Sequence, residues 1–205
     1  MLDKNCKKCR AVGEKLFLKG EKCFTPKCPM VRRGLAIHGK RKRRRALSPY
    51  ARQLLEKQKA KLIYGIKERQ FHRYFDLSYK KKGATPEILA GLLESRFDNV
   101  IFRLGFASNR AAARQLVSHG HFFLNGRKHN ISSSIVKKGD IISVNPKSLK
   151  GNTFKDIKDH LKKYNPPKFL ELDSEKLIGK IIAKPDLEEL KIAIDFPSIV
   201  FRNKV

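Results

Sequence analysis

Apolar residues recur at helical spacing along three neighbouring segments of the chain and predict three consecutive helices. The segments cover about 48–65, 67–81 and 85–93. The first has clear signals at both ends, because Ser48 is a good N-cap before Pro49 and Gly65 interrupts the pattern. This part of the chain is therefore expected to be a helical domain.

The next segment, about 94–145, opens with signals for two short helices. The first is expected over 97–104, with a stop at Gly105. Ser108 is expected to cap the second helix, which ends at Gly120.

Strand-like runs follow the second of these helices. The first two lie at 122–124 and 141–144. A lysine-rich connection with helical potential at about 154–164 follows, and further strand-like runs lie at 169–172, 181–183 and 199–201. Asn125-Gly126 is the strongest short signal for a type I′ hairpin turn. The fold class is therefore α+β: a mostly helical first domain, then two short helices with a small antiparallel sheet.

Charge adds a prediction about partners. The 205 residues include 47 Lys and Arg against 19 Asp and Glu, a net charge of +28. Residues 1–82 carry a net charge of +20, residues 83–164 carry +8, and residues 165–205 are neutral. A field of this size favours a polyanionic partner, with nucleic acid as the first candidate, and the first part of the chain should meet it most heavily.

Membrane and secretory classes are disfavoured by the hydropathy pattern. No apolar run approaches 18 residues, so no transmembrane helix and no membrane partner are expected. The N-terminus lacks the apolar core of a signal peptide. Reduced cysteines in a metal site then suit a cytoplasmic protein better than disulfides do.

All four cysteines lie within the first 28 residues. Cys6, Cys9, Cys23 and Cys28 have the spacing C-x2-C-x13-C-x4-C, two ligand pairs across one loop, which suits a tetrahedral Zn²⁺. Four thiolates leave no open coordination position, so the metal is expected to be structural and not catalytic. Zinc is favoured, and an iron–sulfur cluster, which uses the same ligands, stays open as the alternative.

Basic residues interleave with these cysteines and follow them. The predicted phosphate contacts here are Lys7, Lys8, Arg10, Lys22, Arg32 and Arg33, then the run Lys40, Arg41, Lys42, Arg43, Arg44 and Arg45, and in the helical domain Lys59, Arg69 and Arg73. The six-residue run repels itself and is expected to stay extended until it meets phosphates. A nuclear import signal is its alternative interpretation.

A second predicted surface lies on the two short helices and the hairpin. Arg110 and Arg114 are four residues apart, so they project from one helix face. The predicted contacts are Arg96, Arg103, Ser108, Asn109, Arg110, Arg114, Gln115, His119, His121, Asn125, Arg127 and Lys128. RNA is favoured over DNA because the sequence shows no recognition-helix dimer or zipper that would read a major groove.

Catalysis is not predicted. None of the six histidines has a Ser, Cys or carboxylate nearby in a recognisable catalytic motif, and no glycine-rich phosphate loop is present. We therefore expect no catalytic residues and no small-molecule substrate.

Several motifs carry a family resemblance. They are Leu18-Lys19-Gly20-Glu21-Lys22-Cys23, Glu68-Arg69-Gln70-Phe71, Leu92-Leu93-Glu94-Ser95-Arg96-Phe97-Asp98-Asn99-Val100, Arg103-Leu104-Gly105-Phe106-Ala107, Ala113-Arg114-Gln115-Leu116-Val117, His119-Gly120-His121 and Leu124-Asn125-Gly126-Arg127. The sequence resembles bacterial small-subunit ribosomal protein four, in its zinc-containing form. The motifs from Leu92 onward are similar to the α-L RNA-binding module, which also occurs in pseudouridine synthases and some tRNA synthetases.

The resemblance implies three parts. A four-cysteine metal knuckle and basic arm would cover 1–45. A helical domain would cover 46–93 and be joined by a C-terminal strand at about 190–205. The α-L RNA-binding domain and a β extension would cover 94–189.

The resemblance also implies a cytoplasmic place in the small ribosomal subunit. The protein would be a primary binder of 16S ribosomal RNA at a multi-helix junction and promote early subunit assembly. It would contact small-subunit ribosomal protein five and other small-subunit proteins. A position near the channel by which messenger RNA enters would let it contribute to translational accuracy.

Two departures and two alternatives accompany the resemblance. Residues 34–39 lack the family's proline, and the C-terminus lacks its usual Tyr-Ser-Arg/Lys ending. An RNA-modification protein is one alternative, but its catalytic domain would find no room in this chain. A DNA-binding zinc-finger regulatory protein is the other.

Overall fold

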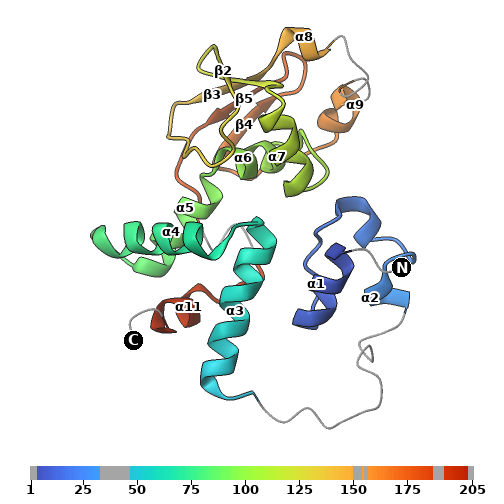
Figure 1. Cartoon of the computed structure of the whole chain (residues 1–205). Helices are drawn as coiled ribbons and strands as arrows, with labels where there is room; N and C mark the ends of the chain where they lie inside the picture. Colours follow the sequence, from blue (N-terminus) through green and yellow to red (C-terminus); the bar gives the residue numbers. More distant parts are fainter. Residues whose placement is uncertain (1–3, 33–46, 150–153, 155–156, 187–191, 203–205) are drawn as a thin grey trace. The chain divides into compact units, whose positions relative to one another are not determined.

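The computed structural model describes residues 4–32, 47–149, 154, 157–186 and 192–202 (Figure 1). The chain divides into two compact units, Met1–Pro86 with Ala193–Val205, and Glu87–Ile192. The predicted basic run 40–45 and Arg33 lie outside the described residues.

The first unit is helical within its described residues. Its elements are α1 (Lys4–Val12), the 3₁₀ turn η1 (Gly20–Cys23), α2 (Pro29–Arg32), α3 (Pro49–Tyr64), α4 (Glu68–Lys80) and α11 (Phe196–Arg202), with α5 (Thr85–Glu94) beginning at its boundary (Figure 1). The N-cap prediction for α3 is confirmed, since the Ser48 hydroxyl accepts a hydrogen bond from the Ala51 amide at 3.2 Å. Gly65 ends α3 in the left-handed conformation, with φ 61°.

The strand predicted at 199–201, within the C-terminal strand of about 190–205, is wrong. This segment is α11, which packs along α3. Phe196, Ile199 and Val200 are buried at the spacing i, i+3, i+4 that one helix face requires. The Asp195 carboxylate accepts hydrogen bonds from the amide and hydroxyl of Ser198 at the helix start, so capping prevails over the strand preference of Ile-Val-Phe.

The second unit combines helices with a five-stranded antiparallel sheet. After α5 come α6 (Phe97–Arg103) and α7 (Arg110–Ser118), then β1 (Phe122–Leu124), β2 (Arg127–His129), β3 (Ile141–Val144), α8 (Pro146–Leu149), α9 (Ile157–Lys162), β4 (Leu170–Asp173) and β5 (Ile178–Ile181). The strand order is β2-β1-β3-β5-β4, and every neighbouring pair is antiparallel. The predicted mixture of helices with a small antiparallel sheet is confirmed.

The core of the second unit joins α6 and α7 to the sheet. Leu104, Val117 and Ile142 have no exposed surface and belong to one apolar cluster. The approach of α6 to β5 is so close that a Cβ on Gly179 would lie 2.4 Å from Leu104 Cδ1. Glycine at this strand position therefore sets the distance between helix and sheet.

Two local predictions around α7 and the hairpin have different outcomes. Asn125 and Gly126 have φ values of 50° and 78°, which confirms the type I′ turn. The N-cap of α7 is Asn109 and not Ser108, because the Asn109 side-chain oxygen accepts from the Ala112 amide at 2.9 Å. Both residue types are good caps, so the sequence could not separate two neighbours.

Candidate nucleic-acid interface

Two buried carboxylates lie beneath the predicted RNA-binding helices of the second unit. Glu94 ends α5 and has no exposed surface, and Asp98 in the first turn of α6 is 2% exposed. Charged groups this deeply buried are stable only when paired and hydrogen-bonded. Their partners are the arginines that the sequence suggested as RNA contacts.

Glu94 holds arginines from two helices. Arg103 Nε and Nη2 donate to its two oxygens at 2.9 and 3.0 Å, a two-point contact that fixes the plane of the guanidinium. Arg110 on α7 lies 3.7 Å from Glu94 and donates through Nε to Asn99 at 2.7 Å. Its guanidinium also lies 4.6 Å from the Phe102 ring centre.

Asp98 holds a second pair of arginines. Arg96 donates twice to it, at 3.0 and 2.8 Å, and Arg114 on α7 approaches to 2.9 and 2.6 Å. Arg96 is itself 2% exposed, so its guanidinium faces the interior. Arg114, with a side chain 33% exposed, is the most exposed of the four arginines.

The ion pairs with Glu94 and Asp98 hold cationic groups in fixed positions on the surface formed by α6 and α7. Four arginines meet two carboxylates, so the cluster keeps a net charge of +2. Arg103, Arg110 and Arg114 are held in single orientations while still partly exposed. A phosphate that binds them would meet donors whose rotamer freedom is already restricted.

The other predicted contacts of this unit lie around the cluster. Ser108, Gln115, His119, Asn125, Arg127 and Lys128 are exposed, whereas Asn109 and His121 are half-buried. Burial, with the charges of His119 and Lys128, lowers the pKa of His121. Because His121 also hydrogen-bonds Ser148 at 2.8 Å, it is a neutral, positioned ring and not a free cation near pH 7.

The first unit presents most of its predicted contacts to solvent, with one exception. Lys7, Lys8, Lys22, Arg32, Arg69 and Arg73 are exposed, and Arg10 is half-buried. Lys59 is 6% exposed and pairs with Glu14 at 2.7 Å. Although burial opposes its charge, Glu14 and Glu56 raise the pKa of Lys59, so it is an internal cation.

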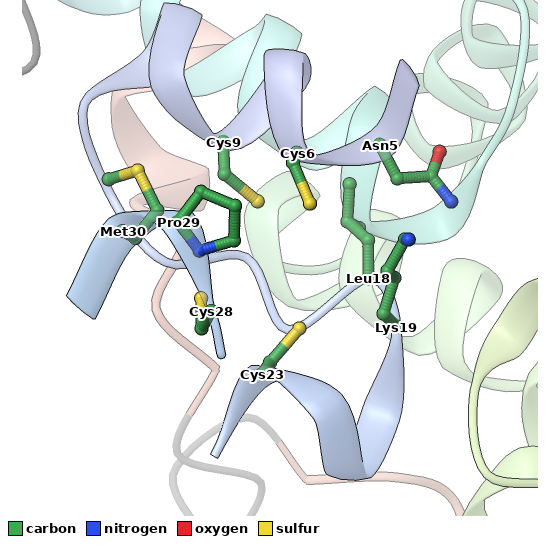
Figure 2. A pocket seen from close by; sticks show the side chains of 9 residues that line it. All are labelled: Asn5, Cys6, Cys9, Leu18, Lys19, Cys23, Cys28, Pro29 and Met30. Atoms are coloured by element: carbon green, nitrogen blue, oxygen red, sulfur yellow. The ribbon is translucent and has the colours of Figure 1, made fainter. Parts of the chain in front are cut away.

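The four cysteines share one pocket. Cys6 and Cys9 point from α1 toward Cys23 and Cys28 on the facing turns (Figure 2). Burial, and the nearness of the other three cysteines, raise the pKa of the Cys9 thiol. Among the residues that the structure describes, no three His, Cys, Asp or Glu side chains are grouped as they would be around a metal ion.

The pocket differs from the expected knuckle in its secondary structure. Cys6 and Cys9 lie in a helix of nine residues, not in a loop. Cys9 and Cys28 also belong to an apolar cluster with Val12, Leu16 and Met30, against which Leu55 and Leu62 of α3 pack. The cysteine segment therefore packs on α3 through a small apolar core.

No described helix is long and apolar enough to cross a lipid bilayer.

Comparison with known proteins defines the class of this chain. The family model for the ribosomal protein S4/S9 N-terminal domain matches residues 1–94, and the model for the S4 domain matches residues 95–142. The S4 match covers α6, α7, the hairpin and the start of β3, and so includes most of the arginine cluster. These matches define a ribosomal protein with an S4 domain.

Relatives extend the match over nearly the whole chain. Small ribosomal subunit protein uS4 of Syntrophomonas wolfei is 46% identical over 200 residues, 97% of this chain and 95% of the relative. The uS4 proteins of Caldicellulosiruptor bescii and Acetivibrio thermocellus are 50% and 48% identical, each over 93% of this chain and 91% of the relative. The chain belongs to the uS4 family of small ribosomal subunit proteins, a structural and non-enzymatic family.

Proposed function

We propose that this protein is a structural component of the small ribosomal subunit that binds 16S ribosomal RNA. The observation that carries the proposal is the identity of 46–50% to uS4 proteins over more than nine-tenths of the chain. The net charge of +28 and the partly exposed arginines held by Glu94 and Asp98 suit a phosphate-rich partner.

The finer role follows from the same family resemblance. The protein binds the RNA at a multi-helix junction, promotes early subunit assembly in the cytoplasm and contributes to translational accuracy near the channel by which messenger RNA enters. Its protein neighbours include small-subunit ribosomal protein five. The neutral segment 165–205 suits protein contacts better than RNA contacts. The proposed RNA contacts are the basic and polar residues that the sequence predicts in both units, together with the run 40–45, with Arg96 and Lys59 as internal supports.

Binding to ribosomal RNA tests the proposal directly. The full chain should co-sediment with the small subunit after a high-salt wash. In competition, it should prefer 16S ribosomal RNA to random RNA and to duplex DNA. Equal affinity for random RNA would contradict specific junction binding, and a preference for duplex DNA would favour a zinc-finger regulator.

A structural zinc ion is the second part of the proposal. Cys6, Cys9, Cys23 and Cys28 fit it by donor chemistry, by spacing and by lining one pocket, although the thiols must come closer together than they stand here. When bound, the ion would join α1 to the turns that carry the other two cysteines. Structural zinc contributes about 10–16 kcal/mol to the folding of zinc-finger peptides.

Metal analysis and proteolysis test the zinc proposal. Purified protein should contain about one zinc per chain, and Cys23→Ser should lose it. A strong chelator should increase cleavage within residues 1–39 and leave the second unit unchanged, because the second unit has a separate core. If the purified protein contains neither zinc nor iron, or if the chelator leaves cleavage unchanged, the metal site is contradicted. Iron found together with labile sulfide would favour an iron–sulfur cluster.

A further inference from the structure

Two phenylalanine rings are stacked on the surface of the cysteine segment. The ring centres of Phe17 and Phe24 are 4.9 Å apart with 26° between the planes. Phe17 is 46% exposed and Phe24 is 73% exposed. The stack uses one face of each ring, and a side chain as exposed as Phe24 keeps its other face available.

The backbone is shaped to hold this pair outward. Leu16 is buried and Leu18 packs on the same apolar cluster, whereas Phe17 between them turns outward. Phe17 has φ 50°, in the left-handed region that a phenylalanine rarely adopts. Such a conformation persists only where the surrounding structure determines it, and it is a reason to look for a function.

The second ring is placed by the buried residue before it. Cys23 is 9% exposed and ends the 3₁₀ turn η1, so the next side chain, Phe24, points away from the pocket. The Phe24 amide donates to Glu21 O at 2.9 Å, and the Gly20 amide donates to Phe17 O at 3.3 Å. Two successive hydrogen-bonded turns thus bring residues seven positions apart into one stack.

The surroundings of the pair favour a polyanion as its occupant. Lys15, Lys22 and Lys27 are exposed in the same segment. Residues 4–32 contain nine Lys and Arg and two Glu, a net charge of +7, and one of these glutamates, Glu14, is paired with Lys59. A purely apolar protein surface would gain nothing from these lysines, whereas an unpaired nucleotide offers both a planar base and a phosphate.

We propose that Phe17 and Phe24 form a stacking platform for an unpaired base of RNA, with the neighbouring lysines on its phosphates. The inference rests on the proposed binding to ribosomal RNA. It adds a contact with a base in the cysteine segment, for which the proposed function names only phosphate contacts. The base continues the stack on Phe24, and the phosphates lie within reach of Lys22 and Lys27. No hydrogen bond to a base edge is needed, so the platform accepts more than one base type.

Photochemical crosslinking tests whether a base lies on the rings. The full chain bound to 16S ribosomal RNA is irradiated with ultraviolet light and digested, and peptide–nucleotide adducts are found by mass spectrometry. A nucleotide adduct on Phe17 or Phe24 supports the proposal. If the complex forms and adducts arise elsewhere with none on these two residues, the platform does not bind a base.

Affinity measurements separate stacking from charge. Phe24→Leu should weaken binding to 16S ribosomal RNA by about 5- to 150-fold, the range for loss of one base–aromatic stack, and Phe24→Trp should bind at least as well as the parent chain. The salt dependence of Phe24→Leu should stay parallel to that of the parent, because no phosphate contact is removed. Lys22→Gln should instead reduce the slope of log affinity against log salt by about 0.7–0.9.

A matched control exists on α4. Tyr79 is 60% exposed and stacked on Phe75, with ring centres 6.5 Å apart, so Tyr79→Leu removes an exposed aromatic ring outside the platform and should bind normally.

Equal affinities of Phe24→Leu and the parent chain for 16S ribosomal RNA would overturn the platform, while the proposed binding to ribosomal RNA would stand. A parent chain that does not select ribosomal RNA would overturn the proposed function. Phe24→Leu could also bind RNA normally and yet fail to enter the small subunit when the other small-subunit proteins are present. That result would make the rings a protein contact and overturn the platform.

Discussion

At the scale of single residues, two buried carboxylates decide which arginines can reach a ligand. Glu94 pairs with Arg103 and Arg110, and Asp98 pairs with Arg96 and Arg114. Each arginine loses rotamer freedom of roughly 2 kcal/mol when it is fixed, and here that loss occurs on folding and not on binding. The carboxylates therefore act on any RNA contact through the arginines that they position.

Removal of the Asp98 charge should destabilise the second unit strongly. Asp98→Asn leaves Arg96 buried with an uncompensated charge, for which we expect a loss of about 3–5 kcal/mol in unfolding free energy. Urea denaturation of the full chain, followed by circular dichroism, measures it. The exposed Asp159→Asn is the matched control and should change stability by less than about 0.5 kcal/mol. A loss below about 1 kcal/mol for Asp98→Asn would mean that the pair is not needed.

At the scale of elements, helix ends and the contacts between neighbouring helices fix the arrangement of each unit. Lys57 and Lys61 on α3 both reach Glu68 in the first turn of α4, at 2.6 Å. Although partial burial opposes ionisation, the two lysines lower the pKa of Glu68 from 4.5 to about 2. This carboxylate therefore joins two helices across the turn after Gly65.

The Glu68 contact should give the first unit a characteristic pH dependence. A folded-state pKa of about 2 lies below the ordinary 4.5, so the stabilisation is complete above pH 4.5 and is lost as the pH falls toward 2. Glu68→Gln should be less stable than the parent at pH 6, and the difference should shrink between pH 4.5 and 2. Thermal unfolding at each pH measures it. A constant difference across this window would show that the charge of Glu68 is not responsible.

The start of α7 provides a test of the corrected cap. Asn109→Ala removes the acceptor for the Ala112 amide and should cost about 1 kcal/mol, within a range of about 0.5–2. Ser108→Ala, one residue earlier, should be nearly neutral, because the Ser108 side chain caps nothing in α7. Urea denaturation of both variants decides between the two caps, and equal losses would contradict the assignment to Asn109.

At the scale of the whole molecule, charge is distributed unevenly along the chain. The segment 1–82 carries +20 and the segment 165–205 carries none, while the two units have separate cores. If each phosphate contact releases counterions, affinity for RNA must fall steeply with salt. Between about 50 and 200 mM salt, a protein making roughly 6–10 contacts loses about 10³–10⁵ in affinity.

Paired substitutions should locate this salt dependence. Lys7→Gln with Lys8→Gln should reduce the slope of log affinity against log salt by about 1.4–1.8, since two exposed cations of the first unit are removed. Lys180→Gln with Lys184→Gln, two exposed lysines in the neutral segment, removes the same charge and should leave the slope unchanged. Filter binding to 16S ribosomal RNA at several salt concentrations measures both. Equal slopes for the two double variants would show that only net charge matters.

The local pattern of the sequence was sufficient for much of the fold. It predicted α3 with its serine cap and glycine end, the hairpin at Asn125-Gly126, and a polyanion-binding charge distribution, because caps, turns and periodicity act over a few residues. The four cysteines also share one pocket, as their spacing suggested.

Only the tertiary structure decided which side chains are buried and which conformation the C-terminal segment adopts. Lys59 is a basic residue like its neighbours, and nothing local reveals that Glu14, far away in the sequence, holds it inside. The run Ile199-Val200-Phe201 has strand preference, yet packing on α3 and the Asp195 cap make it helical. The stack of Phe17 on Phe24 likewise needs two turns and a buried Cys23. Local sequence determined most of the elements and the charge. Burial and pairing, which depend on contacts between segments, determined the C-terminal helix and which charges and rings face outward.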